Sequence, residues 1–91
     1  MLWLISYDIA DDTRRTLVHE TLKNYGRRVQ FSVFECELTP TQLDILRKRL
    51  QFIVDETEDS CRLYRVCLAC LAETAVIGRP DPPGLPNFIV I

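Results

Sequence analysis

An almost continuously apolar segment near the start of the chain constrains the fold more than any other feature. Residues 2–9 read Leu-Trp-Leu-Ile-Ser-Tyr-Asp-Ile. A run of this kind, without regular polar alternation, is typical of a strand that is buried on both faces. The run is too short to span a membrane and no basic segment precedes it, so we expect neither a membrane span nor a signal peptide. The sequence therefore predicts a cytoplasmic chain with no membrane partner.

Capping signals predict two helices after this strand. Residues 11–13 (Asp-Asp-Thr) offer an N-cap with acids in the first turn, and apolar residues then recur at helical spacing until Gly26, the expected C′ residue. Residues 39–42 (Thr-Pro-Thr-Gln) form a capping box with proline at N1. The second helix ends at the acidic cluster 55–59, which we expect to be a solvated loop. Residues 61–71 are strand-like again.

The segment between the two helices changes its alternation. Val29, Phe31 and Val33 alternate in one phase, whereas the apolar positions from Phe34 onward alternate in the other. A shift of one residue moves every side chain to the opposite face of a sheet. We therefore expect a bulge, a kink or a break between Val33 and Phe34, and residues 28–38 can supply two strand segments.

The order of these elements predicts a ferredoxin-like α+β sandwich. In this βαββαβ arrangement two helices cover one face of a single antiparallel sheet. A chain of 91 residues allows one domain, which we place at residues 1–78. Residues 79–91 are rich in proline and end in an apolar run: Phe88, Ile89, Val90 and Ile91. Such a run is predicted to be an extra strand that pairs with the sheet edge of a second subunit.

The charge of the chain is slightly negative but unevenly distributed. Eleven lysines and arginines against thirteen acids give a formal net charge of −2, which excludes a simple polycationic nucleic-acid binder. Residues 13–28 carry five basic side chains and one acid, whereas residues 55–59 carry four acids and no base. We therefore expect a basic face and a separate acidic face.

Asp8 is the strongest single candidate for a functional residue, because it ends a strand that is otherwise apolar. It either caps the next helix or pairs with an arginine, or it binds a metal at the carboxyl end of the strand. One carboxylate binds Mg²⁺ poorly. A two-fold dimer with Asp8 near its axis would bring two carboxylates together, which suits Mg²⁺ or Mn²⁺.

Four arginines are candidates for contacts to a polynucleotide backbone. Arg14 and Arg15 lie in the first turn of the first helix, where a cation opposes the helix dipole, so a phosphate or carboxylate partner is favoured over simple solvation. Arg27 and Arg28 begin the next strand and can lie near the same end of the sheet.

Cys67 and Cys70 have the spacing of a metal or redox motif. On a strand, however, positions i and i+3 point to opposite faces, and one pair completes no tetrahedral site. We therefore expect the cysteines to be buried apolar residues and give little weight to a metal-carrier domain. His19, the one histidine, is expected at the surface or at its boundary.

Three blocks of sequence resemble a known family: residues 7–9 (Tyr-Asp-Ile), Arg14-Arg15, and residues 26–36 (Gly-Arg-Arg-Val-Gln-Phe-Ser-Val-Phe-Glu-Cys). At this separation they resemble the second of the two universal CRISPR-associated (Cas) proteins, Cas-two, most closely over residues 1–38. The resemblance implies a ferredoxin-like two-fold homodimer whose C-terminal strand crosses to the partner. It also implies a metal-dependent endonuclease that acts on RNA or DNA in antiviral defence.

The resemblance assigns roles to particular residues. Asp8 matches the family's metal-binding aspartate. Arg15, Arg28 and Phe34 match positions implicated in nuclease activity or in contact with the substrate. Two functions follow as hypotheses: an endonuclease of spacer acquisition, or a non-catalytic homodimeric scaffold that binds duplex DNA and the Cas integrase (Cas-one).

Overall fold

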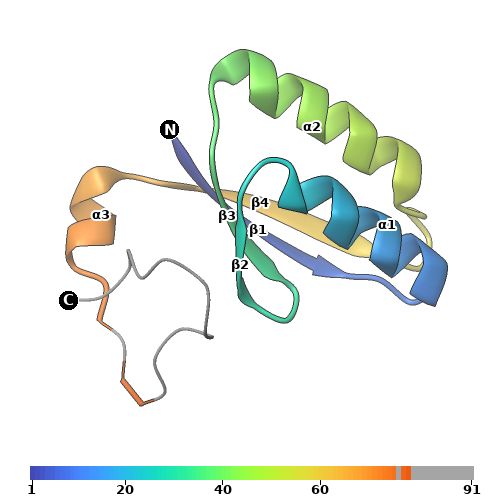
Figure 1. Cartoon of the computed structure of the whole chain (residues 1–91), viewed down its shortest axis with the longest axis horizontal. Coiled ribbons are helices and arrows are strands. Elements are labelled where there is room, and N and C mark those ends of the chain that lie inside the picture. The colour runs from blue at the N-terminus through green and yellow to red at the C-terminus, as the bar shows by residue number, and fades with distance from the viewer. Residues whose placement is uncertain (76, 79–91) are drawn as a thin grey trace.

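The computed structural model describes residues 1–75, 77 and 78, and Figure 1 shows the arrangement of its elements. The elements are β1 (Leu2–Asp8), α1 (Asp12–Lys23), β2 (Arg27–Gln30), β3 (Val33–Glu37), α2 (Pro40–Ile53), β4 (Ser60–Val66) and α3 (Leu68–Ala72). The expected C-terminal strand, its pairing with a partner, and the tail 79–91 as a whole lie outside the described residues.

The four described strands form one antiparallel sheet in the order β2-β3-β1-β4. Figure 1 shows α1 and α2 on one side of this sheet. The predicted fold class, a mixed α+β sandwich with one antiparallel sheet, is therefore confirmed. The apolar strand β1 occupies a central position, as its composition requires.

The core lies between the helices and the sheet. Its fully buried members come from every element of the sandwich except β2 and β4: Ile5, Val18, Leu22, Phe34, Cys36 and Leu46. The opposite face of β1 is less covered, because Leu4 and Ser6 are only half-buried. β1 is therefore buried more on the helix side, through Ile5 and Tyr7, than on the opposite face, and the expected burial on both faces is only partly met.

The segment between the helices forms two strands joined by a tight turn at residues 31–32. The turn lies two residues before the expected break between Val33 and Phe34. A bulge between Arg28 and Gln30 explains the difference, because one extra residue in β2 already shifts the phase of the alternation. Two strands were therefore correctly expected, but the position of the break was wrong.

Gly26 does not act as the C′ residue of α1. Asn24 is the C-cap, and among the described residues only Gly78 has a positive φ. Gly26 is required for a different reason. A Cβ atom at this position would lie 2.0 Å from the Glu35 carbonyl oxygen and 2.6 Å from Cys36 Sγ. The glycine therefore allows the end of α1 to approach β3 closely.

The strand expected at residues 61–71 is shorter than the sequence indicated. β4 ends at Val66, and the chain then enters the short helix α3. Cys67 and Cys70 lie at this helix and are exposed, so their assignment to a strand and their expected burial were both wrong. No described helix is long and apolar enough to cross a membrane.

Candidate functional site

Asp8 stands at the carboxyl end of β1 with its side chain exposed. Its neighbour across the sheet is Ser60 of β4. The helix cap is Asp11, whose carboxylate accepts a hydrogen bond from the Arg14 backbone N–H at 2.9 Å. Among the described residues the Asp8 carboxylate accepts no hydrogen bond and has no ion pair, so neither structural alternative for Asp8 is observed.

Arg15 is fixed beside Asp8 by the backbone that follows it. Its guanidinium donates to the Ile9 carbonyl oxygen from Nε at 3.3 Å and from Nη2 at 3.1 Å. Nη1 also pairs with Asp12 at 2.6 Å. Because about half of the Arg15 side chain remains exposed, at 47%, its charge is accessible from solvent next to Asp8.

The β2–β3 turn approaches the same end of β1. The Tyr7 backbone N–H donates to the Ser32 carbonyl oxygen at 3.0 Å, and the Tyr7 hydroxyl donates to the Phe31 carbonyl oxygen at 3.3 Å. Arg28 lies over the Phe31 ring, with its guanidinium carbon 5.8 Å from the ring centroid. The Phe31 side chain is 89% exposed. We call Asp8, Arg15, Arg28 and Phe31 the Asp8 site.

Two arginines lie toward the end of β1 that carries Asp8. Arg15 binds the Ile9 carbonyl oxygen just after that end, and Arg28 lies over the Phe31 ring of the adjacent turn. Burial raises the pKa of Tyr7 above its ordinary value, and the charges of Arg28 and Arg15 oppose that shift. The contact of either arginine with nucleic acid stays a prediction.

Phe34 does not belong to this surface. Its side chain is fully buried and packs edge-on against His19, with the ring centroids 5.3 Å apart, and at 6.3 Å from Tyr7. A buried ring cannot stack on a nucleotide, so its expected contact with nucleic acid was wrong. The exposed aromatic residue at the Asp8 site is Phe31. Only its place in the turn distinguishes it, and its alternation with Val29 and Val33 had suggested a strand position instead.

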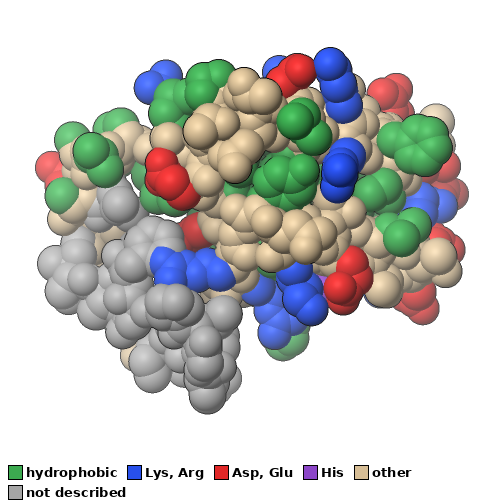
Figure 2. All heavy atoms as spheres, turned by 45° about the horizontal axis from the view of Figure 1, so that its top comes forward, with side chains coloured by type: hydrophobic (Ala, Val, Ile, Leu, Met, Phe, Trp, Pro, Cys, Tyr) green, Lys and Arg blue, Asp and Glu red, His purple; other side chains and the backbone are tan. Residues whose placement is uncertain are grey.

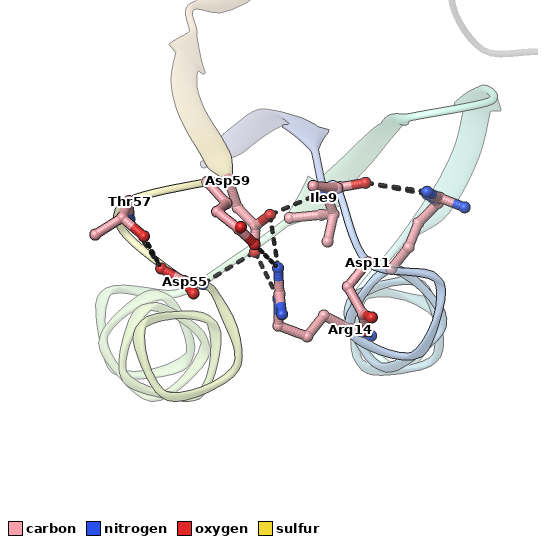
Figure 3. Close-up of polar contacts among 9 residues, drawn as sticks. Ile9, Asp11, Arg14, Asp55, Thr57 and Asp59 are labelled. Atoms are coloured by element: carbon pink, nitrogen blue, oxygen red, sulfur yellow. Dashed lines mark hydrogen bonds and ion pairs between the residues drawn. The ribbon is translucent and has the colours of Figure 1, made fainter.

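Arg14 is engaged within the chain itself. It extends from α1 to the loop before β4, as Figure 3 shows. Its Nε pairs with Asp59 Oδ2 at 2.8 Å, and Nη2 pairs with Glu58 at 3.1 Å. The Asp59 side chain is fully buried and also accepts bonds from the backbone N–H groups of Ala10 and Asp55, at 2.9 and 3.0 Å.

This contact corrects two expectations. The cluster 55–59 is not simply a solvated loop, because Asp59 is its buried centre, and Thr57 donates to Asp55 through both its N–H and its hydroxyl. The basic and acidic stretches also do not form separate faces, because Arg14 joins them. Figure 2 shows basic and acidic side chains interspersed over the helix-bearing side. The carboxylate partner expected for a first-turn arginine is Asp59 of the same chain.

The Asp59 contact predicts an acid-sensitive stability. The hydrogen bond from Arg14, supported by the two backbone N–H groups, holds the pKa of Asp59 well below its ordinary value. A depressed folded-state pKa stabilises the fold fully above about pH 4, the unfolded value, and this contribution is lost as the pH falls toward the folded value. We expect Asp59→Asn to be less stable than wild type near neutral pH in urea unfolding, and to lose less stability by about pH 3.

Glu58→Gln is the matched control, because Glu58 pairs with the same arginine but is 58% exposed. Exposed ion pairs contribute little to stability, so the stability of this variant should depend on pH as that of wild type does. Parallel stability curves for Asp59→Asn and wild type across the acid range would contradict the assignment.

Arg27 lies apart from the Asp8 site. Its Nε is 3.9 Å from Oε2 of Glu35, which faces it across the β2–β3 ladder. Glu35 in turn pairs with Leu4, in the middle of β1. The structure therefore gathers two of the four arginines at the Asp8 site and gives Arg14 and Arg27 carboxylate partners elsewhere.

The donor set at Asp8 fits part of a metal site. Its exposed carboxylate is the hard oxygen ligand that Mg²⁺ and Mn²⁺ prefer, and both ions retain several waters. Among the described residues no group of three or more His, Cys, Asp or Glu could enclose a metal ion. The described residues of one copy therefore do not enclose such an ion by themselves.

Comparison with known proteins gives consistent matches over this fold. The family described as CRISPR associated protein Cas2 matches residues 1–74. A CRISPR-associated endoribonuclease Cas2 of Chloroflexus aurantiacus is 44% identical over 100% of this chain and 99% of its own length. A CRISPR-associated endonuclease Cas2 of Thermus thermophilus is 48% identical, covering 99% of this chain and 96% of its own.

A solved structure gives the same result in three dimensions. One chain of the structure titled "Partial Cas6-RT-Cas1–Cas2 complex" superposes with a TM-score of 0.74 and 28% sequence identity. The match covers 84% of this chain and 89% of the other.

Proposed function

The chain belongs to the CRISPR-associated Cas2 family, and from this premise we propose that it is an endonuclease that cleaves phosphodiester bonds of RNA or DNA in CRISPR spacer acquisition. The observation that carries the proposal is the exposed Asp8 carboxylate, which has no hydrogen bond or ion pair with another described residue, at the end of the sheet where Arg15 binds the Ile9 carbonyl oxygen and Arg28 lies over the Phe31 ring. The relatives' names, endoribonuclease and endonuclease, support a nuclease and leave both nucleic acids as substrates.

The residues of the Asp8 site have distinct roles in this proposal. Asp8 would hold a Mg²⁺ or Mn²⁺ ion. Such an ion, when bound, stabilises negative charge on the phosphate and lowers the pKa of a bound water. Arg15 and Arg28 hold the flanking phosphates, because guanidinium groups bind phosphate oxygens in pairs. Phe31 offers an exposed ring on which a base can stack.

A homodimer would supply the second carboxylate. The described residues of one copy do not enclose an ion, and two copies related by a two-fold axis near Asp8 would present two Asp8 carboxylates to one ion. The sheet face opposite the helices also retains exposed apolar surface for a partner. Leu4 is half-buried there, and its cross-strand neighbour Tyr64 is 47% exposed.

Removal of the metal tests the proposed reaction. Labelled single-stranded RNA and duplex DNA are incubated with the full chain in Mg²⁺, in Mn²⁺, and in excess chelator. We expect cleavage of at least one substrate with either ion and none with chelator, and activity should return when Mg²⁺ is restored. Cleavage at the same rate in chelator would contradict a role of Asp8 through a metal.

Phe31→Ala should weaken the binding of single-stranded nucleic acid. Loss of one base–aromatic stack costs about 1–2 kcal/mol, which is roughly a tenfold rise in Kd. Phe52→Ala is the matched control, because Phe52 is also an aromatic residue of high exposure, at 92%, but lies on α2. Fluorescence anisotropy measures both. Equal Kd values for the two variants would contradict the proposed stacking role of Phe31.

A second function, a scaffold for the integrase, is favoured by the match to a chain in a complex that contains Cas1. In this role the dimer binds duplex DNA and holds the integrase, and cleavage by the dimer is not needed. Spacer acquisition in cells would then survive Asp8→Ala but be lost when residues 79–91 are deleted. Normal acquisition by the deleted chain would count against the scaffold.

A further inference from the structure

Two exposed cysteines meet at the start of α3. Cys67 Sγ and Cys70 Sγ are 2.9 Å apart, and the Cys70 backbone N–H donates to Cys67 Sγ at 3.3 Å. β4 begins opposite Asp8 and ends opposite Leu2, so this pair lies beyond the other end of the sheet from the Asp8 site. Figure 1 shows α3 at the end of β4, apart from α1 and α2.

The other two cysteines of the chain are chemically different. Cys36 is fully buried, and burial, with a smaller effect of Glu35, raises its thiol pKa to about 12. Burial likewise raises the pKa of Cys61 to about 11. Because the thiolate is the reactive form, both are poor nucleophiles in the folded chain. Cys67 and Cys70 are therefore the two thiols that react with solutes.

We propose that Cys67 and Cys70 form a reversible dithiol–disulfide site that exchanges with low-molecular-weight disulfides of the glutathione type. A disulfide needs the sulfurs at about 2.05 Å, so closure requires a movement of about 0.9 Å in a turn that already places them side by side. A tetrahedral metal site needs further ligands, and none of the described His, Cys, Asp or Glu residues completes one. The site does not depend on the nuclease proposed above.

The surroundings assign a different role to each sulfur. The Cys70 backbone N–H donates to Cys67 Sγ at 3.3 Å, and a hydrogen bond to a sulfur stabilises its thiolate. The pKa of Cys67 is lowered accordingly by its contacts with Cys70, whereas contact with Cys67 raises the pKa of Cys70. Cys67 is therefore the attacking thiolate. Cys70 is the resolving thiol, because it lies next to the sulfur that it must reach.

The exchange balances in two steps. The Cys67 thiolate attacks one sulfur of the external disulfide, so a mixed disulfide forms and one external thiolate leaves. Cys70 then loses its proton to solvent and attacks Cys67 Sγ, which expels the second external thiolate. Two protein thiols have been oxidised to one disulfide, and the external disulfide has been reduced to two thiols. The new bond closes the first turn of α3 where the chain leaves β4.

The test uses the reduced full-length chain treated with oxidised glutathione, followed by rapid alkylation of native thiols and intact-mass measurement. The untreated chain should show two fast-alkylating thiols, at Cys67 and Cys70. The treated chain should show neither fast-alkylating thiol. Its mass should be lower by two hydrogen atoms than that of the reduced, unalkylated chain, with no glutathione adduct and no covalent dimer. A dithiol reductant should restore both fast-alkylating thiols.

Two variants isolate each step. Cys67→Ser and Cys70→Ser each keep one exposed thiol, so neither should form an internal disulfide. The glutathione adduct at Cys67 in Cys70→Ser should accumulate faster than the adduct at Cys70 in Cys67→Ser. A wild-type chain that ends as a stable glutathione adduct, as a covalent dimer, or with bound zinc or copper blocking both thiols would overturn the proposal.

Discussion

Asp8→Asn should reduce metal-dependent cleavage by on the order of 100-fold or more, with little effect on folding. Asparagine keeps the size of the side chain but removes the charge, and with it the carboxylate that would bind a divalent ion. The carboxylate is exposed and has no hydrogen bond or ion pair with other described residues, so its replacement should leave the packing of β1 unchanged. Initial rates on labelled RNA and DNA, over a range of Mg²⁺ concentrations, measure the effect.

Asp44→Asn is the control for this substitution. Asp44 is also exposed, but it lies on α2 and forms a surface ion pair with Lys48 at 3.1 Å. Surface pairs of this kind contribute little to stability, so this variant should cleave as wild type does. If Asp8→Asn and wild type cleave at equal rates with equal dependence on Mg²⁺, the catalytic role of Asp8 is wrong, and the scaffold function is favoured.

Gly26→Ala should destabilise the fold by about 3 kcal/mol and lower Tm by more than roughly 10 °C. The added methyl group would lie 2.0 Å from a backbone oxygen and 2.8 Å from a backbone carbon, both of Glu35. Neither atom can move without shifting β3 in the centre of the sheet. Urea and thermal unfolding at one fixed protein concentration measure the loss.

Gly78→Ala provides the comparison. Gly78 has a φ of 102°, but a methyl group there would meet nothing within 4 Å. Its cost is the backbone strain of a side chain at positive φ, about 1–2 kcal/mol if the same conformation persists. A Gly26→Ala chain as stable as wild type would show that α1 and β3 can separate without cost, contrary to the packing described above.

Local signals predicted most of the fold. The capping box at residues 39–42 involves atoms three residues apart, and its two hydrogen bonds form at 2.9 and 3.2 Å as expected. The apolar strand 2–8 became central because only a central position covers so many apolar side chains. Asp8 was identifiable because it breaks that run at the end of the strand. These features depend on neighbouring residues, which a sequence displays directly.

The candidate site was only partly predictable, because the roles of its members depend on long-range packing. Arg14 was grouped with Arg15 by position. Its partner Asp59, however, lies 45 residues away in the sequence, and nothing in the spacing indicates that contact. Phe31 is exposed because it lies in the turn between β2 and β3, whereas Phe34 is buried because it pairs with Ile5 of β1 under the helices.

The sequence by itself determined the order of the elements, the position of Asp8 at the end of the first strand, and the family. Hydrogen bonds and apolar periodicity act over a few residues, so the sequence carries that information locally. Only the tertiary structure decided that Arg14 pairs with Asp59, that the Phe31 ring faces solvent, and that Cys67 and Cys70 meet in a helical turn. These outcomes depend on which segments pack together, and one displaced residue or one shortened strand is enough to reverse them.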